Sequence, residues 1–207
     1  MAQKRTILGL LGVTAFLAAL LLQVLPPQQA SAAQITARSL TLQAGATDGG
    51  SKASGVVRHL FSFSLPSSTS VGSIKFLYCT TAADVAPATC TTPAGLVTTS
   101  ATLTSQNGAT GFSIVNTTNG APYLTRTAAA ATGAVSYQLS TITNPDGSSC
   151  GLPSPATPNC TFFVRISTYA STDTTGPATD TGTVTASTAT QIVLDGIMPE
   201  SLVFCTG

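Results

Sequence analysis

Apolar and polar residues alternate along several short stretches of the chain, and this alternation is the clearest signal for its fold. In residues 56–65 the odd-numbered positions are apolar apart from His59, whereas the even-numbered positions include Arg58, Ser62 and Ser64. A period of two places successive side chains on opposite faces of a strand. We therefore predict a half-buried strand over this stretch.

Other stretches predict strands that are buried on both faces. Residues 71–79 are apolar on both faces apart from Lys75, as is typical of a central strand. Residues 161–170 place Phe162 and two aliphatic residues on one face and Arg165 on the other. Further predicted strands are residues 35–42, 96–104, 111–115, 123–127, 134–143, 183–194 and 201–205.

Turn sequences separate these stretches, and the strongest are Asn107-Gly108 and Asn119-Gly120. Both central residues of a type I′ turn need positive φ, so Asn-Gly predicts a hairpin. After residue 25, no stretch keeps helical periodicity for three turns. The pattern predicts an all-β fold, an antiparallel immunoglobulin-like β-sandwich, with a closed barrel as its main rival.

The start of the chain has the order of an export signal. It contains, in sequence, two bases, an apolar run of nineteen residues, two prolines and a small-residue site: Lys4, Arg5, residues 7–25, Pro26, Pro27 and Ala30-Ser31-Ala32. This order predicts a hydrophobic N-terminal signal helix that is cleaved between Ala32 and Ala33.

The length of the apolar run leaves a second interpretation open. Its nineteen residues are close to the roughly 20 that span a bilayer, so an uncleaved signal anchor is the alternative. Contact with a membrane would then occur only through residues 7–25. On either interpretation we predict two parts, residues 1–32 as signal peptide or anchor and residues 33–207 as a single β-sandwich domain.

Charge excludes one class of function. Charged residues make up 7% of the sequence, against roughly 25% in a typical soluble domain. Two of the eight bases lie in the leader, so six bases and seven acids follow it, a formal net charge of −1. Such a chain offers no basic patch to neutralise phosphates, and we predict no nucleic-acid partner.

The five cysteines suggest disulfides. Cys79 with Cys90 and Cys150 with Cys160 each close a short loop at a strand end, so we predict these two local pairs. Export favours disulfides over metal ligation, and no C-x-x-C pair exists. Cys205 is left over; it is free, or replaces a cysteine of one pair, or joins a second chain in an oligomer.

Few residues are candidates for chemistry. His59 is the single histidine, so a Ser-His-Asp hydrolase would need it as the base, but we expect an ordinary strand residue. Asp173 and Asp180 flank a turn-rich loop and are weak candidates for calcium ligands. Their spacing fits no EF-hand, and surface turn carboxylates are the simpler interpretation. We predict no catalytic residue, metal or cofactor.

Several short segments of the chain carry a resemblance to a known group of proteins: residues 38–42, 61–63, 73–76, 163–173 and 202–207. In these segments the chain resembles a group of uncharacterised exported β-sandwich surface proteins of bacteria with very reduced genomes, of the candidate-phyla type. The resemblance implies export and a β-sandwich, and it implies no activity. Proteins of that group often continue past the last segment, so the resemblance leaves open whether this chain is a truncated member.

These observations lead to three functional hypotheses. We predict a secreted or surface-attached, non-catalytic β-sandwich with a structural or adhesive role in the cell envelope, whose partners are other envelope or host-surface molecules. The alternative is a glycan or host-surface binding module that uses the cysteine-closed loops, because sandwiches often bind through loops at one end. The third is a secreted hydrolase that uses His59. Exposed aromatic residues gathered at one rim, such as Tyr123 and Tyr169, would favour the binding module.

Overall fold

The computed structural model describes residues 32–66, 69–82, 89–148 and 159–189. These residues form strands and connecting loops, with no helix among them. The strands are β1 (Ala33–Gln34), β2 (Thr36–Gln43), β3 (Val56–Leu65), β4 (Ser70–Cys79), β5 (Thr102–Asn107), β6 (Ser113–Val115), β7 (Tyr123–Ala130), β8 (Gly133–Thr143), β9 (Thr161–Tyr169) and β10 (Asp180–Ser187).

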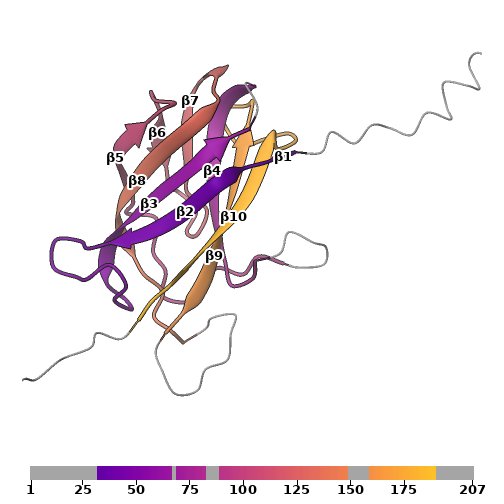
Figure 1. Ribbon diagram of the computed structural model, residues 1–207. Helices are drawn as coiled ribbons and strands as arrows, with labels where there is room; N and C mark the ends of the chain where they lie inside the picture. Colours follow the sequence, from indigo (N-terminus) through magenta and orange to yellow (C-terminus); the bar gives the residue numbers. More distant parts are fainter. Residues whose placement is uncertain (1–31, 67–68, 83–88, 149–158, 190–207) are drawn as a thin grey trace, which may run out of the picture. The chain divides into compact units, whose positions relative to one another are not determined.

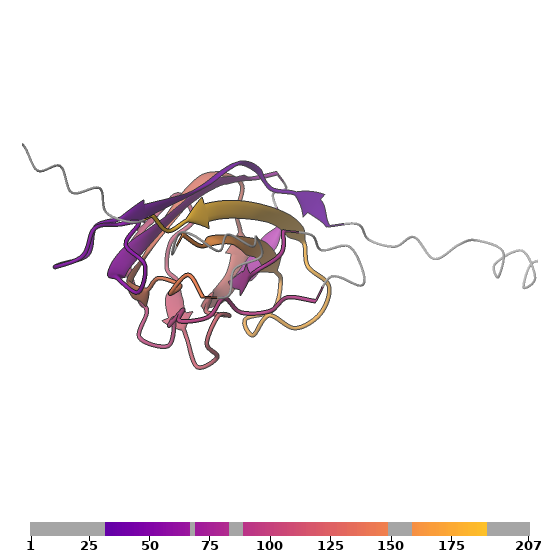
Figure 2. The same ribbon diagram turned by 90° about the horizontal axis from the view of Figure 1, so that it is seen from below.

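The strands make two sheets, which enclose the core between them (Figures 1 and 2). The six-stranded sheet has the order β1-β10-β9-β4-β7-β6, and the four-stranded sheet has the order β2-β3-β8-β5. The prediction of an all-β fold is confirmed. Each sheet has two edge strands, so the described residues form a sandwich and not a closed barrel.

One pairing departs from the predicted antiparallel arrangement. β1 runs parallel to β10, with Ala33 opposite Asp180, and only Ile35 separates β1 from β2. β2 then joins the other sheet, antiparallel to β3. Just after this change of sheet, Ala37 has a φ of 44°, a left-handed conformation that coincides with the register shift between Thr36 and Ser39. The extended segment from Ala33 to Gln43 therefore contributes one strand to each sheet.

The core follows the predicted alternation in β3 and β4. In β3 the inward residues from Val57 to Leu65 are buried at every second position, His59 included. In β4, Ile74, Phe76 and Tyr78 face the core. Phe61 and Phe76 meet across the sandwich with ring centroids 4.3 Å apart. Aromatic packing between these two strands joins the sheets.

The turn predictions are correct for one Asn-Gly pair and wrong for the other. Asn119-Gly120 lies between β6 and β7, which pair antiparallel, so this connection is a hairpin. Asn107 is the last residue of β5, and Gly108 follows it. β5 pairs with β8 in the four-stranded sheet, whereas the next strand, β6, belongs to the six-stranded sheet. Gly108 supplies the expected positive φ of 78°, yet the chain crosses between sheets there.

Two predicted strand boundaries are also corrected. Within residues 96–104, a strand begins only at Thr102, because Leu96 and Thr98 are buried in a loop and Val97 makes one isolated bridge with Thr143. β10 begins at Asp180 instead of residue 183. The remainder of the predicted strand at 183–194, the strand at 201–205 and the N-terminal helix lie wholly or partly outside the described residues. Within the described part, no helix is long and apolar enough to cross a membrane.

Candidate functional site

His59, the one candidate for a catalytic base, lies between the two sheets and is fully buried. Its Nδ1 atom lies 2.9 Å from the hydroxyl of Tyr78, and its Nε2 atom lies 3.0 Å from Oδ1 of Asn144. The ring of Phe162 stacks on the imidazole, with centroids 6.0 Å apart. Both ring nitrogens are therefore occupied by side chains of the core.

The hydrogen bonds of Asn144 determine which nitrogen of His59 carries the proton. The side-chain amide of Asn144 donates to the carbonyl oxygens of Gly50 and Lys52, both at 2.9 Å. Its Oδ1 atom is thus the acceptor that faces His59, so Nε2 carries the hydrogen and Nδ1 accepts from Tyr78. Every donor in the chain from Tyr78 to the two carbonyl groups has an acceptor.

Burial keeps this histidine neutral. Desolvation of the imidazolium form lowers the pKa of His59 to about 4, and the hydrogen bond with Asn144 opposes this only in part. Burial also raises the pKa of the Tyr78 hydroxyl well above its usual value. A general base must reach the proton that it removes, and this imidazole has no free nitrogen and no solvent contact. The hydrolase hypothesis therefore loses the only histidine in the sequence.

The two calcium candidates have different local roles. Asp173 is exposed, and its Oδ1 accepts hydrogen bonds from the backbone and the hydroxyl of Thr175, which lower the pKa of the carboxyl. Asp180 is fully buried at the start of β10, where its carboxylate accepts a hydrogen bond from Thr168 at 2.9 Å. Across the described ranges, no three His, Cys, Asp or Glu side chains gather where they could hold a metal ion.

The structure confirms one of the predicted disulfides, Cys79–Cys90. It ties the loop after β4 back onto the end of that strand, where Thr80 also donates a backbone hydrogen bond to Thr91. Cys160 is disulfide-bonded too, but its partner lies outside the described residues, as do Cys150 and Cys205. The pairing of Cys160 with Cys150 and the role of Cys205 stay predictions.

Aromatic residues gather on the outer face of the six-stranded sheet, a feature that the sequence pattern did not reveal. Lys75 of β4 lies opposite Tyr123 of β7 and opposite Ser167 of β9. Tyr169 lies opposite Ser73, two residues away on the same face. All except Ser73 are half-buried. The alternation in each strand predicts which residues point outward, but only the strand order brings Tyr123 and Tyr169 to either side of β4.

Loops cover this outer face at two places. The loop after β9 lies over Ser73, whose hydroxyl donates to the carbonyl of Ser171 at 2.8 Å, and Thr125 donates to the carbonyl of Thr172. At the other end of β4, the loop that is tied down by the Cys79–Cys90 disulfide covers the strand, and Cys79 is fully buried. A strip around Lys75 and Tyr123 is left half-exposed between them. We call this strip, together with Tyr169, the tyrosine face.

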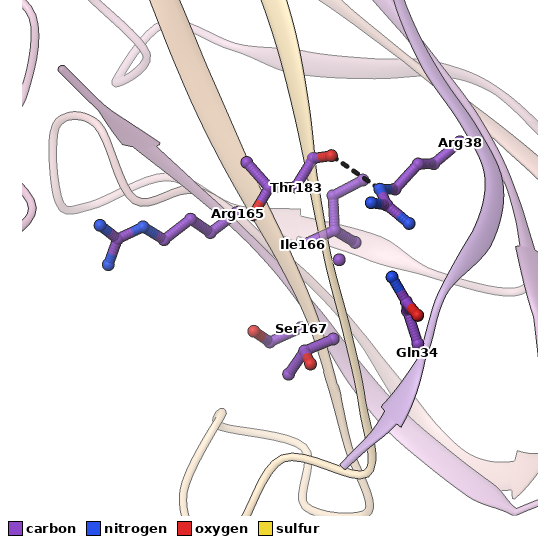
Figure 3. A pocket seen from close by; sticks show the side chains of 8 residues that line it. Gln34, Arg38, Arg165, Ile166, Ser167 and Thr183 are labelled. Carbon is purple, nitrogen blue, oxygen red and sulfur yellow. Dashed lines mark hydrogen bonds between the residues drawn. The ribbon is translucent and has the colours of Figure 1, made fainter. Parts of the chain in front are cut away.

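A second surface feature lies at the corner where β2 runs beside β10 (Figure 1). A pocket of about 350 Å³ opens there between Gln34, Arg38, Arg165 and Ser167, and a neighbouring one of about 550 Å³ continues along β2 and β10. Nε of Arg38 donates to the carbonyl of Thr183 at 2.7 Å. Figure 3 shows the guanidinium group of Arg38 directed toward Thr183 and that of Arg165 directed away from Arg38, so the two do not form a joint anion site.

Comparison with known proteins finds one distant structural likeness and no family. No family model and no curated protein matches the sequence. Among solved structures the chain is similar to BslA, described as a bacterial hydrophobin, with 12% sequence identity, a TM-score of 0.41, and coverage of 79% of this chain and 99% of that chain. At this level of likeness, function does not carry over from one protein to the other.

Proposed function

We propose that the protein is an exported, non-catalytic β-sandwich with a structural or adhesive role at the cell envelope. The observation that carries this proposal is the burial of His59 with both ring nitrogens hydrogen-bonded. The groups that suggested chemistry in the sequence serve the fold, because His59, Asp180 and the Cys79–Cys90 pair each join neighbouring segments of the sandwich. The predicted export signal and the Cys79–Cys90 disulfide support the proposed location, because disulfides persist in oxidising environments outside the cytosol.

The location is tested on intact cells that produce the protein. We expect an antibody against the folded domain to label intact cells or the medium, and added protease to remove the cell-bound label. Mass spectrometry of the mature chain should find Ala33 as its first residue if the leader is cleaved and Met1 if it is retained as an anchor. Detection in the cytoplasm alone would overturn the proposal.

The tyrosine face favours a second candidate function, the binding of a glycan. Tyr123 and Tyr169 flank β4 on one face with Lys75 beside them. Aromatic rings offer flat apolar surfaces to the apolar faces of sugar rings, and the lysine can donate to hydroxyl or carboxylate oxygens. This differs from the predicted use of the cysteine-closed loops, because the aromatic residues lie on a sheet.

A glycan array followed by calorimetry tests this candidate. We expect the best array ligand to bind at least about tenfold more weakly to the Tyr123→Ala and Tyr169→Ala variants, in line with the loss of one aromatic contact. Ser140→Ala on the four-stranded sheet is the matched control and should bind as the parent does. An array without ligands, or equal binding by all variants, would remove the glycan hypothesis and leave the structural role.

We also infer that the sandwich is immunoglobulin-like. In that fold one sheet has the order ABED and the other contains CFG. The order β2-β3-β8-β5 follows the first and β4-β9-β10 the second, with β6 and β7 as an added pair beside β4. The sequence has no Trp, so the Cys-Trp-Cys core of antibody domains is absent. An experimental structure with a different strand order would refute this assignment.

A further inference from the structure

Among the described residues at the corner between β2 and β10, the two sheets are joined by backbone hydrogen bonds only at the two ends of the contact. Backbone hydrogen bonds close it at both ends: Ile35 donates to the carbonyl of Thr181 at 2.7 Å, and Ala189 donates to the carbonyl of Ser51 at 2.8 Å. Between these closures, no strand in the described part of the chain pairs with the outer edge of β10. We call this stretch the open seam.

The direction of the β10 backbone shows which groups face the open seam. The carbonyl groups of Thr181 and Thr183 point to this side, where Ile35 and Arg38 bind them. Residues two apart in a strand point their N–H and C=O groups the same way. The amides of Thr185 and Ser187 therefore face the open seam, whereas those of Val184 and Ala186 face β9, with which they are in register.

The apolar core also reaches the surface here. Leu40 and Leu42 of β2 and Ala186 of β10 pack against the core but stay only partly buried, while inward residues of the central strand β3, such as Phe61, are fully buried. A sandwich that exposes both a strand edge and the rim of its core leaves backbone donors and apolar area for another segment to cover.

We propose that residues 201–205 of the same chain, Ser-Leu-Val-Phe-Cys, add along β10 in the open seam as a further strand. The chain leaves β10 at the closure formed by Ala189 and Ser51. The eleven residues 190–200 that follow exceed the roughly two to five that reverse a chain in a hairpin, so the connection is long enough for the segment to return along β10. In this segment three consecutive apolar residues, Leu202 to Phe204, lie between Ser201 and Cys205, and β-branched and aromatic residues of this kind favour a strand. Covalent linkage gives it a high effective concentration at this site.

Amide hydrogen exchange followed residue by residue by NMR tests this proposal on the full chain. We expect the amides of Thr185 and Ser187 to be protected in the parent and to exchange at least about tenfold faster in the double variant Leu202→Asp/Phe204→Asp. The amides of Val184 and Ala186 should stay protected in both, which also shows that the variant is folded. Thr206→Asp adds a charge just outside the segment and should leave Thr185 protected.

Two results would overturn the proposal. One is exchange at Thr185 and Ser187 that is equally fast, or equally slow, in the parent and in the double variant. The other is protection that disappears on dilution together with a dimer mass in light scattering, because the segment of a second copy would then occupy the open seam.

Discussion

The hydroxyl of Tyr78 donates to Nδ1 of His59 across the sandwich, at 2.9 Å. Tyr78 belongs to β4 of the six-stranded sheet and His59 to β3 of the four-stranded sheet. Asn144, at the end of β8, continues this chain of hydrogen bonds to the loop between β2 and β3. A fully satisfied polar network thus joins both sheets and a surface loop inside an apolar core.

The lowered pKa of His59 predicts a specific loss of stability in mild acid. Between pH 6.5 and about 4 the unfolded chain binds a proton that the folded chain excludes, so the free energy of unfolding falls as the pH is lowered through this window. The full effect is about 3 kcal/mol. It should be seen in urea titrations at pH 7.5 and 4.5, and it should vanish in His59→Phe.

Three aspartates with lowered pKa values do not obscure this window. The pKa values of Asp48, Asp146 and Asp173 are lowered from 3.8, by hydrogen bonds to Lys52, Ser148 and Thr175 respectively. Groups with depressed pKa stabilise the fold above their unfolded pKa and lose that effect as the pH falls through the folded value. Their contribution changes below pH 4, so equal stability at pH 7.5 and 4.5 would contradict the role of His59.

Asn144 should be more important for stability than an asparagine at the surface. Asn144→Ala leaves Nε2–H of His59 and two loop carbonyl groups without their partner, and we expect a loss of about 2–3 kcal/mol. Asn116 also donates to two carbonyl groups, those of Thr99 and Ala101, but it contacts no buried histidine. Asn116→Ala is the matched control; a loss as large as that of Asn144→Ala in urea unfolding would contradict the argument.

The Cys79–Cys90 disulfide should stabilise the fold by restricting the unfolded chain. Its cysteines are 11 residues apart, and the loop-entropy relation gives about 3 kcal/mol for a loop of that size. We expect the double variant Cys79→Ala/Cys90→Ala to unfold at lower urea concentration than the parent. Peptide mapping should show that Cys160 is still oxidised in this variant. Unchanged stability would mean that the loop is held by its other contacts.

Arg126 is expected to act through geometry more than through charge. Its guanidinium group donates to the carbonyl groups of Val71, Thr110 and Ala129 and lies 4.4 Å from the centroid of the Phe112 ring. A lysine cannot reproduce this planar fork, so Arg126→Lys should cost about 1–3 kcal/mol in spite of the retained charge.

The ion pair of Lys52 and Asp48 provides the comparison for Arg126. It lies at the surface with a distance of 2.6 Å, and exposed pairs contribute little to stability because water and salt screen them. We expect Lys52→Gln to change the urea midpoint less than Arg126→Lys does. The opposite order would show that charge, and not the hydrogen-bond geometry, dominates at both positions.

Local sequence predicted the elements well wherever the alternation was sharp. β3 has the predicted bounds, and β4 and β9 differ from the prediction by one residue each. A half-buried strand needs one apolar face, and the pattern therefore marks both its extent and its orientation. The start of the stretch at 96–104 was predicted wrongly because Leu96 is a buried residue of a loop, and burial alone produces the same apolar signal as a strand.

The candidate site was less predictable. The sequence placed His59 on the apolar face of β3, and the structure confirms that position. Its partners Tyr78 and Asn144 lie 19 and 85 residues away, and no local pattern links them to it. The open seam and the placing of β1 and β2 in different sheets depend on contacts of both strands with β10. Arg38 of β2 and Thr183 of β10, for example, are 145 residues apart.

By itself, the sequence determined the all-β class, the inward face of each clear strand, the absence of a second histidine and the cysteine spacing that closes the loop after β4. These properties follow from side-chain chemistry and from the two-residue period of a strand, which are local. Only the tertiary structure decided which strands are neighbours, and with that the closed network around His59, the tyrosine face and the open seam. Each of these depends on contacts between segments distant in sequence, and those contacts are selected by the packing of the whole core.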